Sequence, residues 1–298
     1  MERRNFLKTT GSALFASGAL MGTAGNSEAE VKGEFEISVA AWSWHRMMRK
    51  GEIQMIDQPR LAREAGATGV ELVNQLFPVP LYRYLKELNK AADDAGVKIL
   101  LLMVDGEGSM YSPDFRERKQ AVINHRKWLD IAAVLGCHSI RCNAGEGQVE
   151  PREALRAAAD SFSELSTYAR QYNMNVIIEN HGGLSSDPEW LVALMKAVDM
   201  DNFGTLPDFG NFPRNREGYT IDIYDAVRAM MPYAKAVSAK CYDFDENGNE
   251  TTIDYEKMMQ IVLEAGYNGY VGVEYEGNRL SEPEGIKACV NLLQRFQK

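Results

Sequence analysis

Eight short β-rich runs alternate with longer segments of helical periodicity after about residue 34, and this alternation constrains the fold more than any other feature. Such alternation predicts parallel βαβ units, and eight units that close on themselves make a (β/α)8 TIM barrel. The sequence contains no GxGxxG or GxxxxGK[ST] loop, which disfavours a doubly wound nucleotide-binding fold. We therefore expect one barrel domain over residues 34–298. The expected strands are Phe35–Ala40, Gly69–Val73, Val97–Val104, Ser139–Asn143, Asn175–Asn180, Phe203–Asp208, Ala234–Cys241 and Gly269–Tyr275.

Glycines mark the ends of the helical segments between these strands, as a barrel requires. Gly66, Gly96, Gly136 and Gly266 each stand just past a helical segment and just before a strand. This is the position where a helix commonly ends in a left-handed residue. The expected helices include Leu81–Ala95, Phe115–Leu135, Arg152–Tyr172 and Tyr255–Ala265, with Glu284–Phe296 as the last.

The N-terminus reads MERRNFLK, and an apolar stretch rich in small residues follows from about Gly11 to Ala24. This pattern resembles a twin-arginine export signal over residues 1–30. It predicts a barrel exported to the periplasm, with a surface amphipathic helix as the alternative. The apolar stretch is too short for a stable membrane span, so none is expected once the signal is removed.

Charge and cysteine content narrow the classes of function. The chain has 42 acidic and 33 basic residues, for a net charge of -9. Nucleic-acid binding needs a basic stripe, so we expect no nucleic-acid partner and favour a neutral small molecule, or an anion held by local positive groups. The four cysteines form no CxxC pair and are expected to be buried thiols: Cys137, Cys142, Cys241 and Cys289.

Acidic residues stand at the C-terminal ends of the later strands, where the active site of a (β/α)8 barrel lies. Glu179, Asp208 and Glu274 are expected to converge there with Lys240. A single strand-end carboxylate is often a helix cap or a surface charge. Three together would repel one another unless a cation or a proton lay among them. Oxygen ligands suit Mg²⁺ or Mn²⁺, and an added histidine would permit Zn²⁺, Co²⁺ or Fe²⁺.

Other polar and aromatic residues are expected at the same mouth. Trp42 and Trp44 are equally consistent with core packing and with a platform that stacks on a sugar ring. His181 is either a hydrogen-bonded loop residue or a metal ligand, and Lys240 is either an ion-pair partner or a catalytic group. His125 and His138 are expected to be structural. The candidate substrate-binding residues are Trp42, Trp44, His45, Glu71, Asn143 and Asn211.

Five segments of the sequence resemble the xylose isomerase-like TIM-barrel superfamily, in the branch of sugar phosphate isomerases and epimerases. They are GATGVELVNQLF, VIIENHGG, GTLPDFGNF, AVSAKCYDFDENGNETTIDY and GYNGYVGVEYEG. The resemblance covers the whole chain after the export signal.

The resemblance implies a metal site that takes Glu from strand 5, Asp from strand 6, His from strand 7 and Glu from strand 8. Carried over, three of these are Glu179, Asp208 and Glu274, but Ser238 stands where the histidine is expected. A second histidine that is common in the family is replaced by Asn211. The fourth ligand is then His181, water or a substrate oxygen, unless the metal has been lost.

The mechanism that the resemblance implies is proton movement next to a carbonyl, with a metal that stabilises an enediolate. Glu179 and Glu274 would act as acid and base on opposite sides of the substrate. Lys240 would stabilise the oxyanion or, with a lowered pKa, carry a proton.

These features favour an isomerase or epimerase that depends on a divalent metal (Mn, Mg, Co or Zn) and acts on an unphosphorylated sugar or keto-sugar. The export signal and the lack of an obvious phosphate cradle argue against sugar phosphates. The alternatives are a lyase or hydratase of 3-keto-glycosides and a noncatalytic carbohydrate-binding barrel. The superfamily also contains apurinic endonucleases, which use many histidines, whereas this chain has four. The expected partner is a small carbohydrate. The sequence leaves open whether the chain forms a homo-oligomer.

Overall fold

A computed structural model describes residues 31–298, which form one compact unit. The predicted export signal lies outside the described residues. Eight parallel strands form one sheet in the order β6-β5-β4-β3-β2-β1-β10-β9. These strands are β1 (Glu36–Ala40), β2 (Gly69–Val73), β3 (Lys98–Val104), β4 (Ser139–Cys142), β5 (Asn175–Glu179), β6 (Phe203–Leu206), β9 (Val237–Cys241) and β10 (Tyr270–Tyr275).

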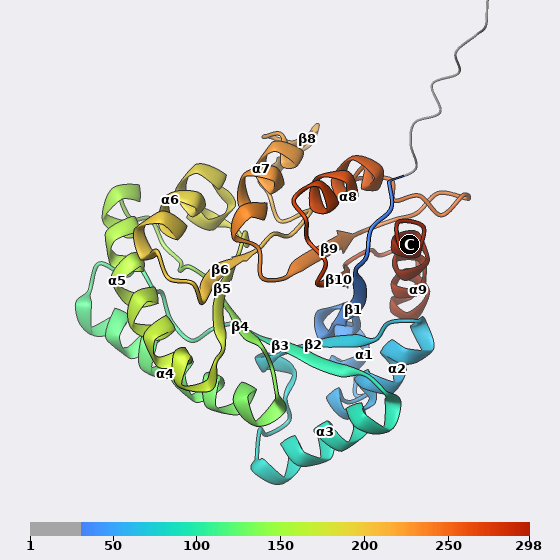
Figure 1. Ribbon diagram of the computed structural model, residues 1–298, viewed down its shortest axis with the longest axis horizontal. Helices are drawn as coiled ribbons and strands as arrows, with labels where there is room; N and C mark the ends of the chain where they lie inside the picture. Colours follow the sequence, from blue (N-terminus) through green and yellow to red (C-terminus); the bar gives the residue numbers. More distant parts are fainter. Residues whose placement is uncertain (1–30) are drawn as a thin grey trace, which may run out of the picture. The chain divides into compact units, whose positions relative to one another are not determined.

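The two edges of this sheet, β6 and β9, meet without a continuous ladder. Isolated parallel bridges join Thr205 to Ala234 and Asp208 to Ser238. The Ser238 N–H donates to the Pro207 carbonyl at 2.9 Å, and the Phe209 N–H donates to the Ser238 carbonyl at 3.1 Å. Pro207 has no N–H to give to the ladder, which limits regular pairing here. The strands thus form a TIM-barrel-like ring (Figure 1).

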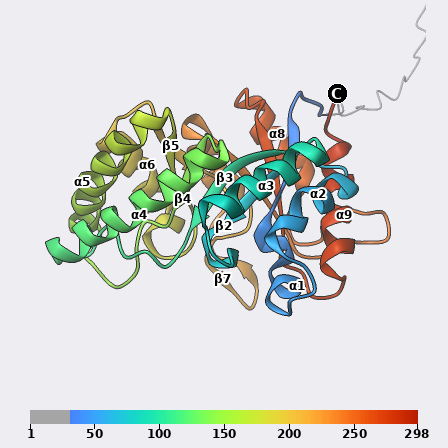
Figure 2. The same ribbon diagram turned by 90° about the horizontal axis from the view of Figure 1, so that it is seen from below.

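Each strand of the ring is followed by a helix on its outer side, as Figures 1 and 2 show. The helices are α2 (Gln58–Ala65), α3 (Tyr82–Ala95), α4 (Phe115–Leu135), α5 (Pro151–Ala169), α6 (Pro188–Val198), α7 (Ile223–Met230), α8 (Tyr255–Glu264) and α9 (Glu282–Gln294). The short helix α1 (His45–Arg49) and the hairpin β7 (Arg214–Asn215) and β8 (Gly218–Tyr219) follow the C-terminal ends of β1 and β6. Figure 2 shows α1 and β7 on the same side of the ring.

Local sequence signals explain where these helices begin and end. The Asp114 side chain accepts hydrogen bonds from the first backbone N–H groups of α4, and the Asp187 side chain does the same for α6. Such caps satisfy donors that have no partner inside the helix. The predicted glycines adopt left-handed φ angles of 99°, 63°, 76° and 76° at Gly66, Gly96, Gly136 and Gly266. The glycines therefore stand where the sequence predicts, although α5 ends at Ala169 rather than Tyr172 and α9 spans Glu282–Gln294 rather than Glu284–Phe296.

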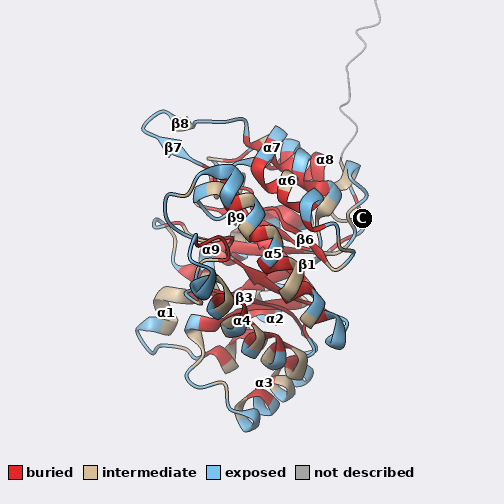
Figure 3. Cartoon of the chain, turned by 90° about the vertical axis from the view of Figure 1, so that its left-hand side faces the viewer, coloured by how far each residue is buried: buried red, intermediate tan, exposed pale blue. Residues whose placement is uncertain are grey.

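The core lies between the ring and its helices, and Figure 3 shows the strands buried within the molecule. Strands that are covered on both faces are expected to be almost continuously apolar, so buried charges on them are exceptional. All four cysteines are buried and free, which confirms their prediction as thiols. No helix among residues 31–298 is long and apolar enough to cross a membrane.

Candidate active site

Three carboxylates converge at the C-terminal end of the ring, as the sequence predicts. Glu179 is the last residue of β5, Asp208 follows β6, and Glu274 lies in β10. One oxygen from each lies within 4.8 Å of the others, and all three side chains are buried. Parallel strands bring their carboxyl ends to the same rim, which explains how residues so distant in sequence meet.

Ser238 lies between two of these carboxylates, at the position where the family resemblance implies a histidine. Its hydroxyl is 2.6 Å from Asp208 Oδ2 and 3.3 Å from Glu274 Oε2. The other oxygen of Asp208 accepts hydrogen bonds from the backbone N–H groups of Gly210 at 2.8 Å and Asn211 at 2.7 Å. Asp208 is therefore held rigidly between the loop that follows it and β9.

Lys240 is a fixed cation in this cluster. Its ammonium nitrogen is 2.9 Å from Glu274 Oε1, 3.1 Å from Glu276 Oε2 and 3.9 Å from Asp208 Oδ2, and the side chain is 1% exposed. Burial by itself would lower the pKa of Lys240, but the surrounding carboxylates outweigh it and raise that pKa well above its ordinary value. The raised pKa favours the alternative in which Lys240 stays charged over the one in which it carries a proton at a lowered pKa.

Arg141 pairs with the carboxylate on the opposite side of the cluster. Its Nε lies 2.8 Å from Glu179 Oε2, and its terminal nitrogen donates to Asp105 Oδ1 at 2.6 Å. Asn143 donates to the same Asp105 oxygen at 2.8 Å. Asp105 was not among the predicted site residues. Its signal in the sequence is that it directly follows β3, just as Asp208 stands shortly after β6.

The buried cluster holds more carboxyl groups than cations. Glu71, Glu179, Asp208 and Glu274 are buried, and the buried cations beside them are Arg141 and Lys240. Burial raises the pKa of Glu179 to about 7 and that of Asp208 to about 7. For Glu274 burial acts in the same direction, but the adjacent Lys240 outweighs it and lowers the pKa. Near neutral pH the cluster therefore takes up either protons or a cation.

The donor atoms fit a divalent cation. Glu179 Oε2 is buried and accepts no hydrogen bond from residues 31–298, although Arg141 lies beside it. The three convergent ligands are all carboxylate oxygens, a set that suits Mg²⁺ or Mn²⁺. His181 is not part of this group in the described chain; it follows β5, is exposed, and its backbone N–H donates to Ser185. Its role as a fourth ligand stays a prediction.

Glu71 lies deeper in the ring than the three carboxylates. Ser38 donates a hydrogen bond of 2.6 Å to Glu71 Oε1, and burial raises the pKa of this carboxyl to about 8. Gly272, two residues before Glu274, makes room for it. A Cβ at Gly272 would stand 2.2 Å from Glu71 Oε1. Glu71 is thus a predicted site residue that the structure places beneath the cluster.

The two tryptophans have different environments. Trp44 is 2% exposed and packs in the core, which supports the core interpretation for this residue. Trp42 is partly buried and donates from Nε1 to Glu276 Oε1 at 2.6 Å. His45 stacks on the Trp42 ring with 4.7 Å between centroids and contacts the Trp42 carbonyl through Nδ1 at 2.6 Å. Trp42 is therefore linked to the carboxylate cluster by its hydrogen bond to Glu276. Its stacking on a sugar ring stays a prediction.

The two predicted asparagines reach the cluster through carboxylates. Asn211 donates to Glu179 Oε1 at 2.8 Å, and Asn143 donates to Asp105. Their amide groups hold acidic side chains in place. A contact with substrate would have to be made in addition to these hydrogen bonds.

A sequence profile described as "Xylose isomerase-like TIM barrel" matches residues 59–296. The chain belongs to this family. Its fold, its strand-end carboxylates and the predicted resemblance agree with that membership.

Similar proteins include both isomerases and deglycosidases. A C-glycoside deglycosidase alpha subunit from Arthrobacter globiformis is 40% identical over 53 residues, which are 18% of this chain and 15% of that protein. A putative hydroxypyruvate isomerase from Streptomyces coelicolor is 26% identical over 76% of this chain and 86% of that protein. The structure of D-psicose 3-epimerase from Clostridium cellulolyticum H10 superposes with a TM-score of 0.73 at 15% identity, covering 88% and 99% of the two chains. The chain thus spans only a small part of the deglycosidase subunit that it matches.

Proposed function

We propose that this protein is a divalent-metal-dependent isomerase or epimerase that acts on an unphosphorylated sugar or keto-sugar. The observation that carries the proposal is the buried group of Glu179, Asp208 and Glu274, whose oxygens lie within 4.8 Å of one another. Such a group at the C-terminal end of a barrel is suited to hold a cation against a bound substrate.

The residues of the site have separate roles in this proposal. Glu179 and Glu274 come from β5 and β10 and would exchange a proton with carbons on opposite sides of the substrate. A divalent cation bound by the three carboxylates would polarise the carbonyl and offset the charge that develops on its oxygen. In the metal-free protein burial raises the pKa of Glu179 to about 7, and a bound cation would keep this carboxylate ionised and able to accept a proton from the substrate. Lys240 stays charged, and its ammonium group stabilises negative charge on the groups beside it.

The charge of the cluster supports a substrate without phosphate. The four buried carboxyl groups are accompanied by two buried cations, and Glu276 and Asp105 add further acids at the rim. A phosphate dianion would meet net negative charge here unless the site carried extra cations. The predicted export signal points in the same direction, since sugar phosphates are mainly cytoplasmic.

Solvent exchange tests the proposal. The full chain is incubated with Mn²⁺ and a panel of free ketoses and 3-keto-glycosides in D₂O, and deuterium next to the carbonyl is followed by NMR. We expect incorporation with at least one ketose, and its loss in Glu179→Gln. The matched control is Glu189→Gln, at an exposed position on α6. A protein that exchanges no substrate proton and binds no metal would instead be the noncatalytic carbohydrate-binding barrel.

A second candidate function is a 3-keto-glycoside lyase. The short match to C-glycoside deglycosidase alpha subunits favours it, as does Ser238 in place of the expected histidine. In this reaction the base takes the proton next to the ketone, a carbon–carbon double bond forms, and the bond to the aglycone breaks as an acid protonates the leaving group. A 3-keto-glucoside of p-nitrophenol separates the two functions: release of p-nitrophenol indicates the lyase, and exchange with the glycoside intact indicates the isomerase or epimerase.

A further inference from the structure

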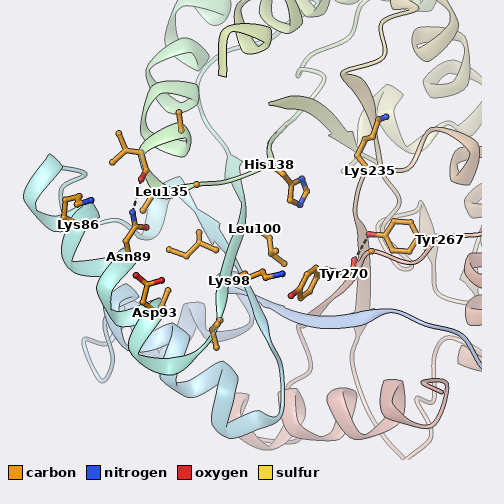
Figure 4. Close-up of a pocket in the computed structure, with 17 residues that line it drawn as sticks. Lys86, Asn89, Asp93, Lys98, Leu100, Leu135, His138, Lys235, Tyr267 and Tyr270 are labelled. Atoms are coloured by element: carbon orange, nitrogen blue, oxygen red, sulfur yellow. Dashed lines mark hydrogen bonds between the residues drawn. The ribbon is translucent and has the colours of Figure 1, made fainter. Parts of the chain in front are cut away.

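A cavity of about 780 Å³ lies at the end of the ring opposite to the carboxylates. Its wall contains residues at the N-terminal ends of strands. Lys98 and Tyr270 are the first residues of β3 and β10, and His138 and Lys235 come shortly before β4 and β9. Helices α3 and α4 close the other side through residues such as Asn89 and Leu135. Figure 4 shows His138, Leu100, Lys98 and Tyr270 around one space.

The charge of this cavity is opposite to that of the whole chain. Lys86, Lys98 and Lys235 line it, and the only carboxylate in its wall is Asp93. None of these three ammonium groups makes a hydrogen bond or ion pair with any residue of the described chain, 31–298. Two other lysines on helices are engaged: Lys90, on α3, pairs with Asp94, and Lys287, on α9, donates to the Ala65 carbonyl. In a chain with a net charge of -9, this is a local excess of unpaired positive charge.

The shape of the cavity depends on glycines at two strand starts. A Cβ on Gly69 would lie 2.6 Å from Leu100 Cδ1 and 2.8 Å from the Tyr270 ring. A Cβ on Gly204 would lie 2.5 Å from the Tyr233 carbonyl oxygen and 2.6 Å from Lys235 Cγ. Only a residue without a side chain leaves the Tyr270 ring and the Lys235 stem where they are. The strands therefore provide space for an aromatic surface and a cation at this end of the ring.

Polar groups with spare hydrogen-bonding capacity complete the wall. The Tyr267 hydroxyl donates to the Tyr270 carbonyl at 2.7 Å, which fixes the backbone beside the cavity. The Tyr270 hydroxyl has no hydrogen-bond partner among residues 31–298. His138 contacts Ser139 Oγ through Nδ1 at 2.7 Å, which leaves Nε2 for another partner. Three kinds of donor thus border one apolar floor that includes Leu100.

We propose that this cavity binds a small organic anion, a phosphate or carboxylate carried on a ring. Lys98 and Lys235 supply the positive charge for the anionic group, and Tyr270 and Leu100 supply the apolar surface for the ring. The site is independent of the proposed catalysis, because it lies at the opposite strand ends and shares no residue with the carboxylate cluster. It gives the protein a place where a metabolite other than its substrate binds.

Calorimetric titration of the full chain with phenyl phosphate at low salt tests the proposal. We expect a Kd below about 1 mM, weakened on the order of tenfold in the double variant Lys98→Gln/Lys235→Gln, since each of the two lost contacts to an exposed ammonium group is worth roughly a factor of three. Lys196→Gln, at an exposed position on α6 outside the cavity, is the matched control and should bind like the parent. Both cavity lysines are exposed, so the double variant is expected to fold.

Further titrations define the ligand and exclude binding at the carboxylate cluster. Benzoate separates a carboxylate ligand from a phosphate ligand, and inorganic phosphate alone should bind more weakly than phenyl phosphate because it lacks the ring. Glu179→Gln should leave phenyl phosphate binding unchanged. The proposal is overturned if neither ring anion binds at about 10 mM, if the double variant binds as tightly as the Lys196→Gln control, or if inorganic phosphate binds as well as phenyl phosphate.

Discussion

At the scale of single residues, the carboxyl groups of the cluster are coupled to pH. Burial raises the pKa of Glu179 to about 7 and that of Asp208 to about 7, so both carry protons below neutrality in the metal-free protein. A cation bound at these oxygens must displace those protons. Proton uptake and metal binding are therefore competing ways of neutralising the same charges.

This competition predicts how metal affinity depends on pH. Between about pH 6 and pH 8 the affinity for Mn²⁺ should rise with pH, by up to roughly tenfold per pH unit for each proton displaced, and then level off. Calorimetric titration of the metal-free protein at several pH values measures it. An affinity that stays flat over this range would show that the two carboxyl groups are already ionised before the metal arrives.

The raised pKa of Glu71 makes folding stability depend on pH. Its pKa in the folded chain is raised from 4.5 to about 8, so the folded state binds the extra proton between these values. Its contribution to stability is complete at pH values below the unfolded pKa and declines as pH rises toward the folded pKa, with a slope of about 1.4 kcal/mol per pH unit.

Glu71→Gln, which mimics the protonated carboxyl, should remove the Glu71 share of this slope, leave the shares of Glu179 and Asp208, and stabilise the metal-free protein at pH 8 relative to the parent. Urea unfolding of both proteins at pH 5 and pH 8 measures the difference. Glu87→Gln, at an exposed position on α3, is the control and should keep the slope. Equal slopes in parent and Glu71→Gln would mean that Glu71 is ionised in the folded chain.

At the level of elements, the approach of the Glu71 side chain, from β2, to β10 depends on one glycine. A Cβ at Gly272 would meet the Glu71 carboxyl, so Gly272→Ala should cost roughly 1–3 kcal/mol of folding free energy through overpacking. The double variant Gly272→Ala/Glu71→Ala opens the space again and should cost less than the sum of its single changes. Urea unfolding of the four proteins measures this coupling. Additive costs would show that the two residues do not compete for the same space.

Periodicity predicted the elements well because strand and helix signals are local. Strand β2 and helix α4 have the bounds that the sequence predicts. Strand β6 ends at Leu206 rather than Asp208, because Pro207 has no N–H for a ladder bond. The hairpin of β7 and β8 was not predicted, since two-residue strands carry no alternating pattern.

The site was predicted only in part, for a physical reason. Strand position and alternation are enough to bring Glu179, Asp208 and Glu274 together. The pairing of Arg141 with Asp105 was not predicted, because it depends on which rotamers neighbouring strands allow. The same holds for the state of Lys240, whose pKa is raised because three carboxylates from other strands surround it.

At the scale of the whole molecule, the two ends of the ring differ in charge. Buried carboxyl groups lie at the C-terminal strand ends, and unpaired lysines line the cavity at the other end. Since residues that follow strands and residues that precede them belong to different loops, each end can change without the other. One barrel therefore has room for a catalytic site and for a separate anion site.

We also propose that the whole chain is exported through the twin-arginine route. Arg3→Lys/Arg4→Lys should keep the protein in the cytoplasm of the producing bacterium, because the pair of arginines is the feature that the export receptor reads. Cell fractionation followed by immunoblotting measures the distribution. The variant Arg49→Lys, within the described barrel, is the control and should be exported. Equal periplasmic amounts of the parent and the double variant would contradict this route.

In the proposed function Glu179, Asp208 and Glu274 together hold a divalent cation. Anomalous X-ray scattering at the manganese edge, from crystals grown with Mn²⁺, locates such a cation. We expect one strong peak within bonding distance of an oxygen from each of the three carboxylates, and its loss in Asp208→Asn. Crystals of the parent protein with no manganese peak among these oxygens would show that the three carboxylates hold no cation.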